Sequence, residues 1–213
     1  MRITWIGHAC FLVDAEEARI LTDPFSEDVP YNFPETSVDI VTVSHAHSDH
    51  NAVHRVPGDP AVIEATGGLD VRGVTINGIP SFHDGSGGKE RGPNTLYRFV
   101  LEGVTIAHLG DLGTLLDAAQ RAALGDVDVL LIPVGGNYTI DANQAASIAE
   151  DLASVKLVFP MHYKTQVIAD WPIAPVEEFE ALMDNVRHVG AATVEVTRGS
   201  LPEQQEVWIL DHA

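Results

Sequence analysis

Three histidines and an aspartate lie within six residues of one another, at His45, His47, Asp49 and His50. Neutral imidazoles and carboxylates bind Zn²⁺, Mn²⁺ and Fe²⁺, and both groups also transfer protons. The cluster follows the apolar segment Val38–Val43, which is typical of a buried strand. In an extended loop that leaves such a strand, residues 45, 47 and 49 point the same way, and residue 50 projects differently as the chain turns. The spacing therefore predicts a loop that offers ligands to two metal ions.

Four side chains from one loop do not complete two metal sites, so the cluster predicts further ligands later in the chain. Three candidates each follow an apolar run, where a sheet offers its edge to a ligand, namely His83, Asp111 and His162. His108 competes with His83 for the first site. It lies three residues before Asp111 within a predicted strand, so the two-residue period turns it to the other side and favours a buried, hydrogen-bonded histidine.

The elements that must position these side chains are mostly strands, because short apolar runs punctuated by Gly, Pro and Asp recur along the chain. Strands are expected at Ile3–Ile6, Phe11–Val13, Ile20–Thr22, Ile40–Val43, Ala61–Ile63, Val74–Ile79, Leu96–Leu101, Val104–His108, Val129–Pro133, Leu157–Phe159, Thr193–Val196 and Val207–Leu210. Helices are expected at Thr114–Leu124, at Ala142–Ala153 with Asp141 as N-cap, and at Val176–Val186. Many strands with a few helices predict two sheets with helices outside them.

Composition limits the classes of protein and partner. The 213 residues, 45% of them hydrophobic, suit a single domain over residues 1–213 with a sizeable core. A net charge of −19 disfavours nucleic acid as a partner. No apolar run approaches the ~20 residues of a membrane-spanning helix. Cys10 is the only cysteine, which excludes an intrachain disulfide and favours the cytoplasm. A homo-oligomer stays open.

The sequence resembles the metallo-β-lactamase superfamily, in particular its small single-domain branch of metal-dependent hydrolases that includes ascorbate-phosphate lactonase-like proteins. The segment "HAHSDH" matches the His-x-His-x-Asp-His motif of that family in full. Further resemblance lies in "WIGHACFLV", "ILTDP", "HLGDL", "LLIPVGGNYTIDANQA" and "PMHYKT". The resemblance implies an α/β fold, a four-layer αββα sandwich with the site at one edge of its two sheets.

The resemblance also implies how the ligands divide between two divalent ions, with zinc expected and manganese or iron as alternatives. Asp111 would bridge the ions, with His45, His47 and His83 on one ion and Asp49, His50 and His162 on the other. One departure bears on the first site. His83 is followed by Asp84 and Gly85 and not by the Thr-Pro-Gly of many relatives, so the choice between His83 and His108 stays open.

The positive charge of two divalent ions exceeds the negative charge of Asp49, Asp111 and a bridging hydroxide, and the imidazoles are neutral. Such a centre therefore keeps a net positive charge and attracts an anion. A hydroxide that bridges the ions would attack a carbonyl carbon or a phosphorus, and no G-x-S-x-G nucleophile is present. Asp49 and Asp111 are the expected catalytic residues, and Asp49 in particular would orient the hydroxide and relay its proton. The expected reaction is hydrolysis of a small, anionic ester, lactone or phosphodiester.

Supporting residues are expected around the ligands. A metal-bound imidazole usually donates its other N–H to a carboxylate or carbonyl, and His8 and Asp23, each at the end of a predicted strand, are candidates for such contacts. Asp23 is equally compatible with the start of an Asp-Pro turn. Candidate substrate contacts are Lys89, Arg91, Tyr138 and Lys164. The first two lie in the Gly-rich segment 83–94, which is either an ordinary surface loop or a mobile flap.

Two other functions fit the same ligands. One is an iron-dependent oxidoreductase on the same fold, although no flavodoxin-like part exists in this chain. The other is a non-catalytic metal-binding protein, which the complete ligand set disfavours because loss of activity should release at least one ligand. Elemental analysis separates zinc or manganese from iron, and turnover of a chromogenic phosphodiester and of a simple lactone separates a hydrolase from a binding protein.

Overall fold

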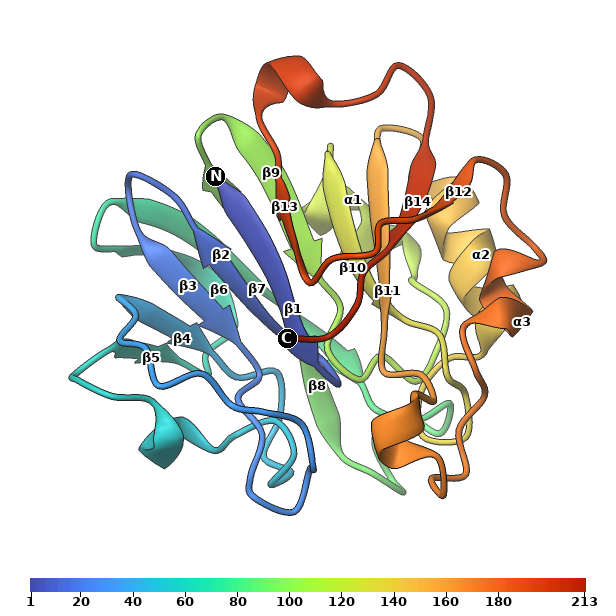
Figure 1. Cartoon of the computed structure of the whole chain (residues 1–213), viewed down its shortest axis with the longest axis horizontal. Helices are drawn as coiled ribbons and strands as arrows, with labels where there is room; N and C mark the ends of the chain where they lie inside the picture. The colour runs from blue at the N-terminus through green and yellow to red at the C-terminus, as the bar shows by residue number, and fades with distance from the viewer.

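Two β-sheets stack face to face in the computed structural model, which describes residues 1–213 (Figure 1). The smaller sheet has six strands in the order β13-β1-β2-β3-β4-β5. Their bounds are β1 (Arg2–Gly7), β2 (Cys10–Asp14), β3 (Arg19–Thr22), β4 (Ile40–Thr42), β5 (Ala61–Ile63) and β13 (Thr193–Glu195). The larger sheet has eight strands in the order β12-β14-β11-β10-β9-β8-β7-β6. These are β6 (Gly67–Val71), β7 (Val74–Phe82), β8 (Pro93–Leu101), β9 (Val104–His108), β10 (Val129–Pro133), β11 (Leu157–Met161), β12 (Val186–His188) and β14 (Glu206–Ile209).

The main hydrophobic core lies between the two sheets. Successive residues of a strand face opposite sides of its sheet. Ile20 and Ile40 therefore belong to the core between the sheets, whereas their neighbours Leu21 and Val41 belong to a smaller cluster on the outer face. Both faces of β3 and β4 are thus covered, which agrees with their continuous apolar sequences.

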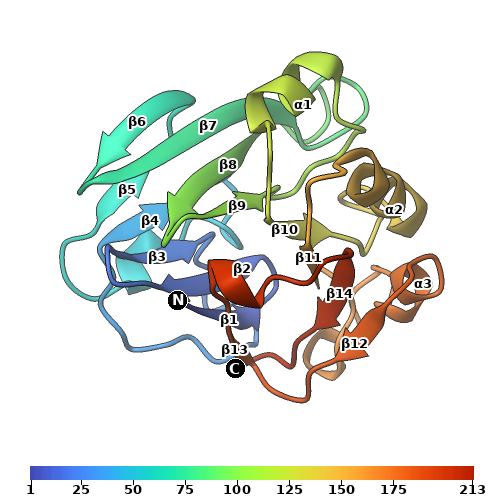
Figure 2. The same cartoon turned by 90° about the horizontal axis from the view of Figure 1, so that it is seen from above.

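The outer layers differ in kind. Helices α1 (Ala118–Leu124) and α2 (Ala142–Asp151) lie over the outer face of the eight-stranded sheet, and α3 (Glu177–Glu180) packs beside α2 (Figure 2). The outer face of the six-stranded sheet is covered by the irregular segment 24–39, which buries Phe25 and Val29 against it. The predicted α/β fold of two sheets between outer layers is confirmed, and one of those layers is irregular chain.

Each predicted strand is present, and the helix predicted at 142–153 has the expected Asp141 cap, whose side chain accepts the N–H of Gln144. The helix predicted at Thr114–Leu124 begins later, because Asp117 caps it through Gln120.

The predicted helix Val176–Val186 is wrong beyond Glu180. Asn185 has a left-handed φ of 54°, and Val186 instead starts β12, which pairs with β14. The sequence also missed β6, whose first two residues are glycines. Pairing with distant strands overrides local pattern in both places.

The carboxyl ends of the central strands meet at one edge of the molecule, toward the bottom of Figure 1. Strands β3 and β4 run parallel to each other in one sheet, as do β9, β10 and β11 in the other. Loops that leave these strands are therefore brought together even when they are distant in sequence.

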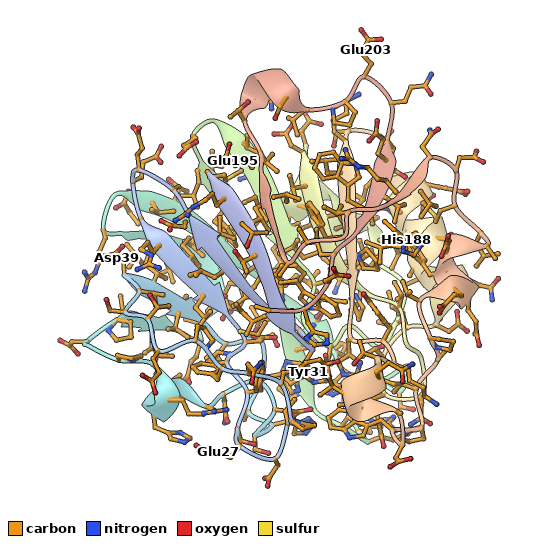
Figure 3. The ribbon with its side chains drawn as sticks, in the orientation of Figure 1. Glu27, Tyr31, Asp39, His188, Glu195 and Glu203 are labelled. Carbon is orange, nitrogen blue, oxygen red and sulfur yellow. The ribbon has the colours of Figure 1, made fainter.

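The surface is strongly acidic on several sides, where exposed carboxylates such as Glu27, Glu195 and Glu203 project from separate loops and strands (Figure 3). None of the helices combines the length and apolarity that a bilayer crossing requires.

Candidate metal centre

Every candidate ligand comes from a loop at the carboxyl end of a strand. Residues 45–50 follow β4, His83 follows β7, and His162 follows β11. Asp111 lies three residues after β9. These strands belong to both sheets, so the candidate centre lies where the edges of the two sheets meet.

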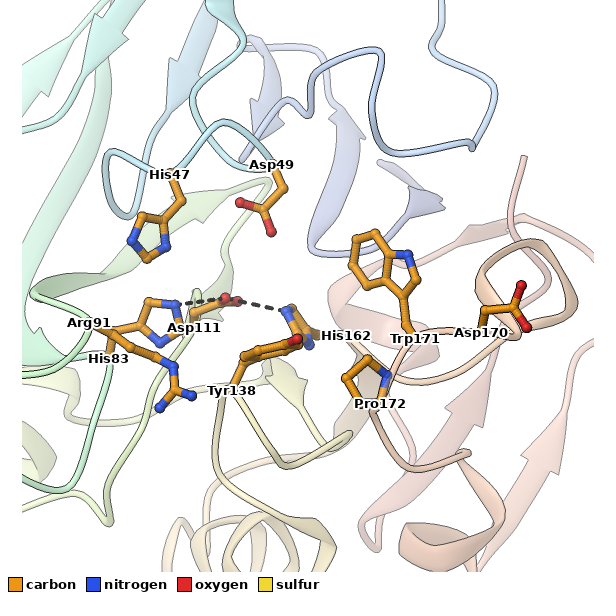
Figure 4. Close-up of a pocket in the computed structure, with 10 residues that line it drawn as sticks. All are labelled: His47, Asp49, His83, Arg91, Asp111, Tyr138, His162, Asp170, Trp171 and Pro172. Atoms are coloured by element: carbon orange, nitrogen blue, oxygen red, sulfur yellow. Dashed lines mark ion pairs between the residues drawn. The ribbon is translucent and has the colours of Figure 1, made fainter.

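Asp111 lies in the middle of the histidines (Figure 4). Its Oδ2 atom is 3.2 Å from the Nε2 atoms of His50, His83 and His162. The Nε2 atom of His45 is 4.0 Å from the same oxygen. Burial opposes ionisation of this carboxyl group, but His162 and His50 outweigh burial and hold its pKa well below the ordinary value.

The candidate ligands include two separate groups of donor atoms near Asp111, and Asp23 joins His45 and His50 in a third group. The potential ligand atoms of His45, His47 and His83 lie within 4.8 Å of one another, and the same holds for a group made of His8, Asp49, His50 and His162. All seven residues that the sequence singled out as ligands are therefore close together, and His8 joins them.

The structure distinguishes His83 from its competitor. His108 is fully buried, and its Nε2–H donates to the carbonyl oxygen of Ala9 at 2.8 Å. Its Nδ1 atom accepts the N–H of Gly110 at 3.3 Å. Both ring nitrogens of His108 are thus occupied, and only His83 reaches the cluster.

Several buried polar atoms in the cluster lack a hydrogen-bond partner. They include Nε2 of His50 and Oδ1 of Asp111. Buried polar groups are nearly always paired, so unpaired atoms at the meeting point of imidazoles and carboxylates call for a ligand. Nitrogen and oxygen donors in this combination suit a divalent cation such as zinc. The residues present fit a metal centre.

Asp23 supports the imidazoles from behind. It is fully buried, and its carboxylate accepts the backbone N–H of Ser44 at 2.7 Å, the hydroxyl of Ser44 at 2.6 Å and Nδ1–H of His50 at 2.8 Å. The Ser44 Oγ atom is also 2.9 Å from Nδ1 of His45. Because Ser44 gives its only hydroxyl proton to Asp23, its oxygen accepts Nδ1–H of His45.

One carboxylate thus keeps the proton on Nδ1 of both His45 and His50, which leaves the Nε2 lone pairs free to bind metal. Sequence reasoning predicted the contact of Asp23 with an imidazole but missed Ser44. The available signal was its position between a buried strand and the first histidine.

His8 lies against the second group of candidate ligands. Its Nε2 atom is 3.2 Å from Oδ2 of Asp49, and burial lowers its pKa to about 4, so the neutral ring donates this hydrogen bond at neutral pH. The backbone is left-handed at His8, Asp23 and His162, with φ values of 54°, 40° and 52°. Such conformations are unfavourable for residues other than glycine and gather at functional sites.

A pocket of about 440 Å³ opens over the cluster (Figure 4). It is lined by the candidate ligands His47, Asp49, His83, Asp111 and His162 and by Arg91, Tyr138, Asp170, Trp171 and Pro172. The guanidinium of Arg91 lies over the Tyr138 ring, 5.4 Å from its centre, within the range of a cation–π contact.

Two predicted substrate contacts do not reach this pocket. Lys89 is exposed on the outside of its loop, and Lys164 lies in a segment whose backbone pairs with Ala174, so neither lines the pocket. Trp171 and Pro172 were missed by sequence reasoning. The available signal was a scarce tryptophan, one of three, soon after the last candidate ligand.

Known proteins resemble this chain over most of its length. Residues 2–162 match the family model described as "Beta-lactamase superfamily domain". The chain belongs to the metallo-β-lactamase superfamily.

This superfamily member is 32% identical to a UPF0173 metal-dependent hydrolase of Carboxydothermus hydrogenoformans, with 94% of this chain and 99% of the relative covered. It is 33% identical to a protein of the same description from Pyrococcus furiosus, with 86% and 92% covered.

A solved structure from Thermotoga maritima, described as a candidate Zn-dependent hydrolase of the superfamily, superposes with a TM-score of 0.84 at 39% identity. The match covers 100% of this chain and 99% of that one. The predicted resemblance is confirmed, and with it the prediction of a metal-dependent hydrolase.

Proposed function

We propose that the protein holds two divalent cations, zinc in the first place with manganese or iron as alternatives, and hydrolyses a small anionic ester, lactone or phosphodiester. The observation that carries the proposal is the division of the donor atoms into two groups about one buried carboxylate. A single ion would not need seven ligands, because zinc sites in proteins usually have four.

In this proposal Asp111 would contribute to the binding of both ions. His45, His47 and His83 would hold one of them, and Asp49, His50 and His162 would hold the other. When bound, divalent ions polarise a substrate oxygen and lower the pKa of water towards neutrality, which supplies the nucleophile.

The two carboxylates have different roles because their exposure differs. The Asp111 side chain is 2% exposed and is surrounded by imidazoles, so its role is to hold negative charge in place among the ligands. The Asp49 side chain is 30% exposed and lines the pocket. Burial opposes its ionisation, but the hydrogen bond from His8 and the nearby His50 ring hold its pKa below the ordinary value. Asp49 is therefore the carboxylate that accepts a proton from the attacking water and passes it to the leaving group.

Electrostatics favour a small anion. The only cationic side chain that lines the pocket is Arg91, on a protein with a net charge of −19. A volume of about 440 Å³ lies within the range of small-molecule sites. A polyanion would be repelled by the wider surface, whereas a compact anion meets mainly the field of the metal centre and of Arg91.

The electrophile is tested directly with a panel of lactones and phosphodiesters that carry the same leaving group, assayed with metal-reconstituted protein. Turnover of either class above a metal-free control supports hydrolysis. The iron-dependent oxidoreductase would instead require iron in the purified protein and an oxygen-consuming reaction. The absence of turnover across the panel, together with full metal content, would favour the non-catalytic metal-binding protein.

Asp111→Asn tests the bridging role. We expect turnover to fall by more than about 100-fold and at least one metal ion to be lost. Mutation of a residue that only hydrogen-bonds to a metal ligand already lowers metal affinity or activity by about 10- to 100-fold. Circular dichroism should show an intact fold. The matched control is Asp14→Asn, which removes a carboxylate paired with the exposed Arg2. Full turnover and full metal content in Asp111→Asn would exclude the bridging role.

A further inference from the structure

The carboxylate of Asp84 organises the loop that carries Arg91, residues 84–92, which we call the Asp84 loop. Four backbone N–H groups donate to this carboxylate. Those of Ser86 and Gly88 reach Oδ1 at 2.8 and 2.9 Å, and those of Glu90 and Arg91 reach Oδ2 at 3.0 and 2.8 Å. A carboxylate has about four acceptor sites, so Asp84 is saturated by its own loop. The segment is therefore folded around a buried carboxylate.

The turn of the loop depends on Gly88. Its φ of 78° aims its N–H at Asp84, and an added Cβ would lie 2.9 Å from the Phe82 ring and 3.1 Å from the carbonyl oxygen of Gly92. Gly92 in turn donates to Gly88 and accepts from His83, both at 3.1 Å, which closes the loop at the end of the β7–β8 hairpin. The loop thus has one well-defined backbone path.

This path separates three neighbouring charges. Lys89 is exposed to solvent, and the carboxylate of Glu90 accepts the hydroxyl of Ser86 at 2.7 Å. Arg91 alone turns into the pocket, where it rests on Tyr138 and forms no ion pair with a carboxylate. Its five N–H donors stay available to a ligand.

We propose that Asp84 is the positioning residue for Arg91, and that this pair selects substrates that carry a second anionic group away from the bond that breaks. The inference rests on the proposed function, since it assigns the substrate class of the same pocket. A cation whose backbone N–H is already fixed loses less freedom when it binds an anion, so its selectivity is greater than that of a cation on a mobile loop.

The end of the pocket opposite Arg91 indicates a second feature of the substrate. Figure 4 shows Trp171 and Pro172 on the far side of His162 from Arg91. The Trp171 ring meets the His8 ring edge-on, with centres 5.4 Å apart, so its position is supported by the candidate centre itself. The pocket therefore suits a small molecule with an anionic group at the Arg91 end and a flat apolar group at the Trp171 end.

A double-mutant cycle tests the pair. Binding of 4-phosphonobenzoate, a non-hydrolysable compound with two separate anionic groups on a flat ring, is measured by calorimetry on metal-loaded protein for the unmodified chain, Arg91→Gln, Asp84→Asn and the double variant. We expect Arg91→Gln to raise Kd by about 10- to 100-fold, the range for a hydrogen bond to a charged group. Asp84→Asn should raise Kd by about 10-fold, because the amide cannot accept four N–H groups. In the Arg91→Gln background, Asp84→Asn should cause no further increase in Kd, because the effects of residues that act as a unit are not additive.

Controls separate positioning from charge and from folding. Lys89→Gln and Glu90→Gln change the charge of the same loop without releasing Asp84, and we expect changes below about twofold because exposed charges are screened. Metal content is measured in every variant because His83 precedes Asp84. Gly88→Ala perturbs the loop by steric means and should also raise Kd. Hydrogen exchange at the amides of residues 86, 88, 90 and 91 should accelerate in Asp84→Asn.

The proposal is overturned if Asp84→Asn leaves Kd unchanged, or if it raises Kd equally with and without Arg91, because Asp84 would then act on the fold and not through Arg91. Binding is measured without turnover, so the outcome does not depend on hydrolysis. Failure to hydrolyse any ester would refute the proposed function and leave this cycle intact. Additive effects alongside normal hydrolysis would refute only the role of Asp84.

Discussion

Asp23→Asn is the substitution that most directly probes how the protein prepares its imidazoles for metal. The carboxylate of Asp23 is fully buried and faces three donors, two from Ser44 and one from His50. Asparagine has nearly the same shape, but one of its two terminal atoms is an NH₂ group that only donates. In either orientation of the amide, at least one donor therefore faces another donor.

The consequence for the metal is specific. Where the NH₂ group faces Nδ1 of His50, the ring relieves the conflict by moving its proton to Nε2, and this form cannot bind metal through Nε2. Returning the proton to Nδ1, as metal binding through Nε2 requires, leaves a buried donor unsatisfied and costs about 1–3 kcal/mol. Since about 1.4 kcal/mol is tenfold in an equilibrium constant, we expect metal affinity to fall by roughly 5- to 150-fold.

Competition with a chromogenic chelator gives the affinity for each ion, and metal counting after dialysis gives the stoichiometry. We expect one ion to be lost first, because His50 contacts Asp23 directly whereas His45 contacts it only through Ser44. Asp39→Asn is the control, since Asp39 also accepts a backbone N–H, that of Arg19 at 2.9 Å, but lies partly exposed and away from the histidines. Unchanged affinity for both ions in Asp23→Asn would refute the reasoning about proton placement.

Two further predictions concern stability. Gly110→Ala should lower the free energy of unfolding by about 1–3 kcal/mol, because Gly110 has a φ of 53° and the new Cβ would lie 2.5 Å from Oδ1 of Asn94 and from Cβ of Ser44. An unchanged urea midpoint would contradict this. For Tyr31, burial raises the pKa from 10.0 to about 12, so the unfolded chain ionises first and Tyr31 contributes a loss of stability as pH rises from about 10 towards 12. Tyr31→Phe loses the hydrogen bond to Thr165, so the variant should be less stable than the unmodified protein at pH 8. The variant has no hydroxyl to ionise, so this difference in unfolding free energy should be smaller at pH 11. An equal difference at both pH values would count against the assignment.

The strands were predictable from the sequence because the predicted ones contain short apolar runs bounded by turn residues, and β4, β10 and β11 are buried along their whole length. Local pattern failed where a distant partner decides the structure. Val186 continues a helical pattern in sequence, yet it starts a strand because β14 offers it backbone partners. The glycines of β6 carry no strand signal, and that strand exists through its pairing with β7.

The chemistry of the candidate centre was determined by the sequence itself, since His45, His47, Asp49 and His50 leave a buried strand in a loop whose two-residue period aims them in a predictable way. Which distant side chains join them was decided only by the tertiary structure. The two-residue period of a strand predicted that His108 is a core residue. Only the folded structure shows that His108 donates to the carbonyl oxygen of Ala9 and that His83 lies close to Asp111. Likewise, the direction of Arg91 depends on how one buried carboxylate, Asp84, gathers the backbone of its loop. The physical reason is that the direction of a side chain in a loop is set by packing and hydrogen bonds to residues far along the chain, and these contacts exist only after folding.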